Sequence, residues 1–234
     1  MLGYFTATLY VYQEADLAAG PLTVTSVRER VVDFSKPLLF TSIVAIMKQK
    51  HATRWNIRTL DDLGRQSNIK YGVLESGATK SFFESSRNAL YAKMWLEMDR
   101  DVNGLVRTNE AGINRVISSN DEHPWAFIGE SSLLEYAAKG RCDLKVVAAH
   151  HPIGRGLSMA TPIGSMHRDR LTLAILEMLE DGQIQNARIK WFDAPFTSNP
   201  VHCDAQRFVP TLCIILLYSN FFTLLSLTNF FLSL

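Results

Sequence analysis

The chain has 234 residues, 47% of them hydrophobic, and its 24 basic and 23 acidic residues leave a net charge of +1. This length accommodates one or two domains with a substantial core. The balanced charge argues against a nucleic-acid partner, which typically requires a basic stripe. Three cysteines without a CxxC pair argue against a zinc module or a disulfide framework, and we expect neither a metal nor a cofactor.

The stretch from Asp16 to Pro37 carries the first candidate site. Leu17–Ala19 predicts a short buried strand that Gly20 closes, and residues 26–32 predict one or two helical turns with Val27 and Val31 on one face. These elements bring together three groups, which are the carbonyl of Pro21, the hydroxyl and amide of Thr23, and the guanidinium of Arg28. Such a set suits the ammonium and carboxylate of an α-amino acid. A lone arginine is more often a solvated surface residue.

An apolar run of ten residues, 38–47, predicts a buried strand because it is too short to span a bilayer. The polar stretch 48–58 predicts an irregular linker. Thr59 then predicts a helix start, since Asp62 follows it three residues later.

Residues 69–73 predict a strand, and the turn after it leads into a helix through Phe82 and Phe83. The free amides at this helix start predict an anion site. The alternative is an ordinary helix start that binds nothing.

Residues 125–128 predict a buried strand that delivers Glu130 to the start of the next helix, where Ser132 and Glu135 form a candidate capping box. Without further context, Glu130 is better explained as a partner of the helix dipole alone. Further helices are predicted at 90–98, 108–117 and 184–191, and a strand at 143–149. A long helix capped by Ser165 is expected to bury Leu171, Ile175, Met178 and Leu179.

The last 27 residues, 208–234, contain no charged side chain. This length is sufficient to cross a membrane, and it predicts a C-terminal transmembrane helix.

Three strings resemble the ligand-binding segments of ionotropic glutamate receptors of the kainate and AMPA type. They are PLTVTSVRERVVDFSKP, YGVLESGATKSFF and ATPIGSMHRDRLTLAILEMLEDGQIQNARIKW, in that order along the chain. The resemblance covers the chain from about Asp16 to Cys203. It implies an α/β fold, a two-lobed clamshell like that of periplasmic binding proteins, with a first lobe that is incomplete at its start.

The resemblance also implies roles for individual residues. Pro21, Thr23 and Arg28 would hold the α-amino-acid end on the first lobe, while the second lobe would contribute Ala78 and Thr79 for carboxylates and Glu130 for the ammonium. It pairs Cys142 with Cys203 in a disulfide, which would require an oxidising, extracellular setting. Leu157 stands where the family usually has an aromatic residue lining the ligand pocket.

The resulting organisation has a first ligand-binding segment at 1–47, a linker at 48–58 where the family inserts its channel helices, a second ligand-binding segment at 59–207 and the membrane helix at 208–234. The implied function is that of a glutamate receptor subunit without its own pore. It would bind L-glutamate or a similar amino acid, assemble with other subunits of a tetrameric family, and lie in the plasma membrane, including the postsynaptic membrane, with its binding domain outside.

Two alternatives remain open, which are a stand-alone amino-acid-binding protein of the transport type and a non-functional receptor fragment. An enzyme is not expected, because no nucleophile–base pair, metal set or phosphate loop occurs in the sequence.

Overall fold

The computed structural model describes residues 15–193, and the structural statements below concern these residues. The predicted membrane segment 208–234 and two of the cysteines, Cys203 and Cys213, lie outside them. Within residues 15–193, no helix combines the length and apolar character that crossing a membrane demands.

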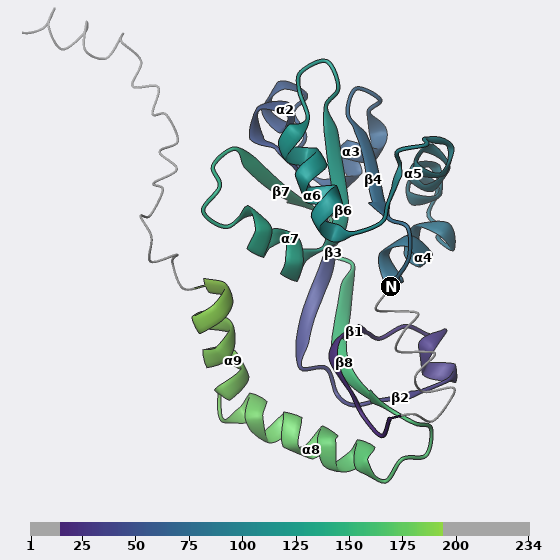
Figure 1. Ribbon diagram of the computed structural model, residues 1–234, viewed down its shortest axis with the longest axis vertical. Helices are drawn as coiled ribbons and strands as arrows, with labels where there is room; N and C mark the ends of the chain where they lie inside the picture. The colour runs from purple at the N-terminus through teal and green to yellow at the C-terminus, as the bar shows by residue number, and fades with distance from the viewer. Residues whose placement is uncertain (1–14, 194–234) are drawn as a thin grey trace, which may run out of the picture. The chain divides into compact units, whose positions relative to one another are not determined.

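Strand β3 (Leu39–Lys48) takes part in two sheets and thereby joins two lobes. Its first half pairs antiparallel with β8 (Gly154–Thr161), and its second half pairs antiparallel with β6 (Trp125–Glu130) and β7 (Leu144–Ala148). Figure 1 shows β3 and β8 running together between the two groups of elements. A single long strand therefore couples the two lobes.

Lobe 1 is built on β8. Strands β1 (Ala18–Thr23) and β2 (Asp33–Phe34) both pair antiparallel with it, and the 3-10 helix η1 (Arg28–Arg30) lies between them in the chain. Helix α8 (His167–Glu180) follows β8, and α9 (Gln183–Arg188) and a π-helical turn, η2 (Ile189–Asp193), complete the described chain.

Lobe 2 contains the second sheet and most of the helices. Strand β4 (Lys70–Leu74) pairs in parallel with β6 and with β5 (Leu105–Val106). The helices of this lobe are α2 (Gln49–Arg54), α3 (Leu60–Arg65), α4 (Ala78–Glu84), α5 (Ala89–Arg100), α6 (Asn109–Ser118) and α7 (Ser131–Ala138).

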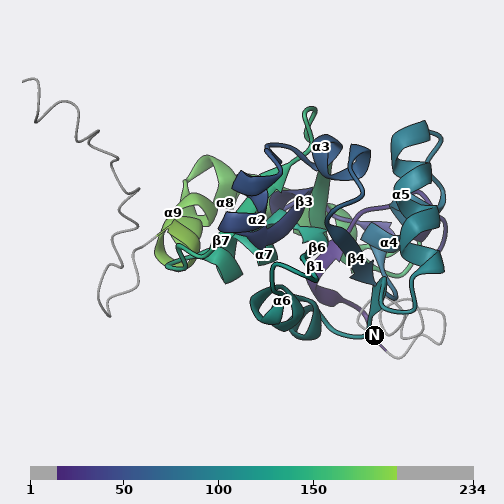
Figure 2. The same ribbon diagram turned by 90° about the horizontal axis from the view of Figure 1, so that it is seen from above.

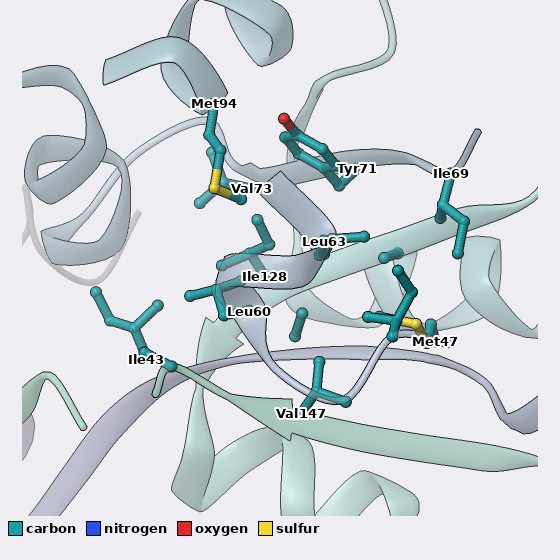
Figure 3. Packing of buried hydrophobic residues seen from close by; sticks show 14 of the residues in the cluster. Ile43, Met47, Leu60, Leu63, Ile69, Tyr71, Val73, Met94, Ile128 and Val147 are labelled. Carbon is teal, nitrogen blue, oxygen red and sulfur yellow. The ribbon is translucent and has the colours of Figure 1, made fainter. Parts of the chain in front are cut away.

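The second sheet is buried on both faces. Alternation along β3 places Ile43 and Met47 in one cluster, which includes residues of α3 and α5, and Val44 and Ile46 in another, which includes residues of α6 and α7. Figure 3 shows the first cluster, and Figure 2 shows α3 and α6 on opposite sides of β3 and β6. Cover on both faces is what a sheet with parallel strands requires.

Several predicted elements are confirmed. The apolar run 38–47 forms β3, residues 90–98 lie within α5, and residues 108–117 correspond to α6 with Thr108 as its N-cap. Thr59 and Asp62 form a reciprocal capping box at the start of α3. These elements were predictable because local periodicity and capping chemistry agree with the tertiary packing.

Other details of the prediction were wrong. Strand β1 continues through Gly20 and Pro21 to Thr23, but its register with β8 shifts between Ala18 and Leu22, so the glycine and proline mark an irregularity within the strand rather than its end. The helical turn at 26–32 is only a three-residue 3-10 helix, and Val27 is 71% exposed. The stretch 48–58 is not wholly irregular, since α2 buries His51 and Ala52.

Two helix starts and one helix face also differ from the prediction. Helix α8 begins after Met166 rather than Ser165, and α7 begins after Glu130 without a side-chain cap. On α8, Ile175 is the buried residue, whereas Met178 and Leu179 are exposed. The periodicity of α8 therefore identifies its apolar face but not what covers that face.

Candidate functional site

A cleft of about 1,410 Å³ is lined by residues from both lobes. Lobe 1 contributes the segment around η1 and the start of α8, lobe 2 contributes the turn before α4 and its exposed side, and the start of β8 lies between them. The predicted site residues Arg28 and Ala78 both line this cleft. A concave site between two lobes is a common location for a small ligand.

Arg28 is held in place by lobe 1. Its backbone amide donates to Thr25 Oγ1 at 3.3 Å, and its Nη1 donates to the carbonyl oxygen of Thr23 at 2.8 Å. Burial lowers the pKa of Arg28, while the nearby carboxylate of Glu130 raises it. A guanidinium has five N–H donors, so this side chain keeps donors for a carboxylate.

Glu130 lies near Arg28 but belongs to the other lobe. It is the last residue of β6 and the N-cap of α7, and its Oε1 accepts a hydrogen bond of 2.6 Å from the hydroxyl of buried Thr23. The structure therefore brings Thr23, Arg28 and Glu130 together, and their role in binding a ligand stays a prediction. The Thr23 hydroxyl is engaged by Glu130, and Thr23 itself does not line the cleft.

The junction between the lobes is reinforced next to Glu130. Ser131 Oγ lies 3.1 Å from Thr41 Oγ1 and accepts a hydrogen bond of 3.1 Å from the amide of Ser42. Because Ser131 follows Glu130 directly, these contacts to β3 fix the start of α7 and the position of the carboxylate.

Ala78 and Thr79 are the first two residues of α4. Gly77 precedes them with a φ of 106°, a backbone conformation that favours glycine. Both residues are buried, but only Ala78 lines the cleft. Pro21 lies within β1, before Thr23. Arg28 and Ala78 thus share the cleft, whereas Glu130 does not line it and acts on it through the charge that it places near Arg28.

Two findings were not predicted. Leu157 is buried and pairs with Leu39 and Thr23, so it does not line the cleft as expected. Arg155, two residues earlier on β8, lines the cleft instead. Burial lowers the pKa of Arg155, Glu130 raises it and Arg28 lowers it. Alternation along a strand indicates that Arg155 and Leu157 lie on the same face of β8. It does not indicate that Arg155 lines the cleft while Leu157 is covered by neighbouring strands.

Cys142 is disulfide-bonded, and the partner cysteine lies outside the described residues. The pairing with Cys203 therefore stays a prediction. Among residues 15–193, no cluster of three His, Cys, Asp or Glu side chains could hold a metal ion.

Comparison with known proteins gives the site a context. Residues 8–51 match a family model described as the ligated ion channel L-glutamate- and glycine-binding site, a range that contains Pro21, Thr23 and Arg28. The chain is 36% identical over 137 residues to the kainate 1 ionotropic glutamate receptors of Homo sapiens and Macaca fascicularis, and 35% identical to that of Rattus norvegicus. These alignments cover 58% of this chain and 14% of each receptor.

The fold is also similar to a solved structure, Drosophila muscle GluRIIB in complex with glutamate. The TM-score is 0.72 at 25% sequence identity, and the match covers 80% of this chain and 72% of the other. These comparisons confirm the resemblance to the ligand-binding domain of ionotropic glutamate receptors. The three kainate relatives are receptors and not enzymes, which agrees with the expected absence of catalysis.

Proposed function

We propose that this chain is an ionotropic glutamate receptor subunit, or part of one, whose two lobes bind L-glutamate or a similar amino acid in the cleft. The observation that carries the proposal is the meeting of Arg28 from lobe 1 with Glu130 from lobe 2, where each is fixed by Thr23. A cationic fork beside an anionic acceptor complements the two charged groups of an α-amino acid.

In this proposal Arg28 binds the α-carboxylate, because one of its nitrogens already anchors on Thr23 and leaves the fork oriented. Glu130 accepts from the α-ammonium through oxygen lone pairs that the Thr23 hydroxyl leaves available. Pro21 contributes its carbonyl, and Ala78 and Thr79 contribute backbone amides from lobe 2. A ligand that contacts both lobes stabilises their approach and shifts the population toward the closed form.

The wider context belongs to the same proposal. Cys142 pairs with Cys203, the segment 208–234 crosses the plasma membrane, and the binding domain faces the exterior. The first and second ligand-binding segments are 1–47 and 59–207, joined at 48–58, and the chain assembles with other receptor subunits. The glutamate bound to the Drosophila relative and the L-glutamate-binding description of the family model support the choice of ligand.

Calorimetric titration of the full chain with L-glutamate tests the proposal. Arg28→Ala is expected to weaken binding at least about 30-fold, because it leaves a buried charged group of the ligand unpaired. The matched control is Arg30→Ala, since Arg30 lies on the same turn, is exposed and does not line the cleft. Equal affinity in the wild type and Arg28→Ala, with circular dichroism unchanged, would reject the site.

A further inference from the structure

A second guanidinium lies in the cleft beside the proposed ligand site. Arg155 lines the cleft at the start of β8, where β8 pairs with β3 at the junction of the lobes. Its Cζ lies 5.2 Å from the centre of the Phe82 ring on α4. The side chain is thus positioned by both the junction strand and lobe 2.

Arg155 carries an unused donor. Its Nε is buried and has no hydrogen-bond partner among the described residues. Within residues 15–193, no carboxylate lies within 4.0 Å of the guanidinium in an ion pair. A buried donor without an acceptor is unfavourable unless a ligand or water supplies one. The cation–π contact with the Phe82 ring offsets part of that cost, but it does not replace the missing hydrogen-bond acceptor of Nε.

The charges around Arg155 do not balance. Burial lowers the pKa of Arg155, and two charged groups also act on it, namely Glu130, which raises the pKa, and Arg28, which lowers it. One carboxylate therefore faces two guanidiniums. Two of the other cations that line the cleft have carboxylate partners, since Lys80 pairs with Glu84 at 3.2 Å and Arg168 pairs with Asp169 at 3.0 Å. The remaining charged residues of the lining, Glu29, Lys36 and Glu75, are exposed to solvent.

The ammonium and α-carboxylate of a bound amino acid do not remove this excess of positive charge. Together they add no net charge, so one guanidinium would remain without an anionic partner after Arg28 and Glu130 are occupied. A second acidic group on the ligand side chain would supply the missing negative charge to the Arg155 side chain that lines the cleft.

We infer that Arg155 is a specificity-determining residue of the cleft, which binds the side-chain acid of a dicarboxylic amino acid and discriminates against its neutral amide. This inference rests on the proposed function and adds to it a residue and a reason for ligand choice. Discrimination arises because a neutral amide leaves the guanidinium without a charge-assisted hydrogen bond, while the α-amino-acid contacts stay the same.

Calorimetric titration of the full chain with L-glutamate and with L-glutamine tests the inference. Arg155→Gln is expected to weaken L-glutamate binding at least about tenfold, the effect of losing one hydrogen bond between charged groups. Binding of L-glutamine should change less than about threefold, so the preference for glutamate collapses. Arg155→Lys keeps the charge and should retain part of the preference.

The matched control is Arg168→Gln, which removes one positive charge from the same cleft but one that Asp169 already neutralises. Its glutamate-to-glutamine ratio should equal that of the wild type. A ratio that Arg155→Gln leaves unchanged, or an equal loss of both ligands, would overturn the role of Arg155 while leaving the Arg28 site intact. Absence of any binding by the wild type would instead reject both.

Discussion

The two lobes are packed very differently. Lobe 2 has a sheet buried on both faces, with side chains such as Phe127, Ile128 and Leu63 fully inaccessible to solvent. Among residues 15–193, the hydrophobic cluster of lobe 1 contains three buried residues, Leu22, Val32 and Ala160, with Ala18 and Phe34 packed against them. Apolar side chains on this lobe, including Val27 and Ile163, are largely exposed.

This difference in packing gives the lobes different roles, because lobe 2 holds most of the buried core and lobe 1 supplies the arginine of the proposed ligand site. The extensive core of lobe 2 fixes the positions of Ala78 and Glu130. Lobe 1 contributes the arginine that the proposed function requires, yet it orients Arg28 through local hydrogen bonds to Thr23 and Thr25 rather than through a deep core. We therefore expect lobe 1 to depend on its contacts with lobe 2, and each prediction below tests a part of that dependence.

The largest effect is expected in the core of lobe 2. Phe127→Ala should lower the free energy of unfolding by about 3–5 kcal/mol, because a fully buried aromatic side chain leaves a cavity. Leu22→Ala in lobe 1 should cost only about 2 kcal/mol, since a small core with accessible surroundings collapses more easily. Urea denaturation followed by circular dichroism measures both, and an equal or larger loss for Leu22→Ala would contradict the comparison.

A smaller effect is expected from the hydrogen bond that joins the lobes. Thr23→Val removes the donor to Glu130 and should lower the free energy of unfolding by about 1.5–3 kcal/mol, the range for a hydrogen bond to a charged group. Thr23→Ser keeps the hydroxyl and serves as the control. If Thr23→Val and Thr23→Ser lower the free energy of unfolding equally, the hydrogen bond from Thr23 to Glu130 does not contribute to stability.

The smallest effect is expected at the start of α3. Burial raises the pKa of Asp62, but the Thr59 side chain, the amides of Arg58 and Thr59, and the charge of Arg65 outweigh it and lower that pKa below its ordinary 3.8. The carboxylate therefore stabilises the fold above its unfolded pKa, and this contribution disappears as the pH falls through the lower folded value.

Asp62→Asn should accordingly reduce stability by about 0.5–1 kcal/mol at neutral pH and by progressively less below about pH 4. Thermal unfolding across this pH range, compared with Asp61→Asn as a neighbouring control, measures the change. A difference that stays constant with pH would show that the charge of Asp62 is not what stabilises the cap.

The sequence was most informative where local chemistry and packing agree. The pair Thr59 and Asp62 predicted a cap that forms as expected, and the apolar run of β3 predicted a buried strand. The family resemblance assigned Arg28 and Glu130 to one ligand site, a pairing that local reasoning alone would have missed because the two residues lie on different lobes, and the structure brings both of them to Thr23.

The sequence was least informative where tertiary contacts decide. Gly20 and Pro21 signal the end of a strand, yet they lie within β1, where its register with β8 shifts. Arg155 and Leu157 are two residues apart and share a face of β8, and nothing in the local sequence indicates that the arginine, not the leucine, lines the cleft. The exposed face of α8 likewise follows from what packs against it and not from its periodicity.

Hydrogen exchange of the full chain with and without L-glutamate tests most directly whether one ligand is held by both lobes. The account predicts that saturating L-glutamate slows amide exchange in two separate regions at once, around η1 on lobe 1 and around α4 and the start of α7 on lobe 2. Protection confined to one lobe, or unchanged exchange in both at a concentration that saturates binding, would contradict it.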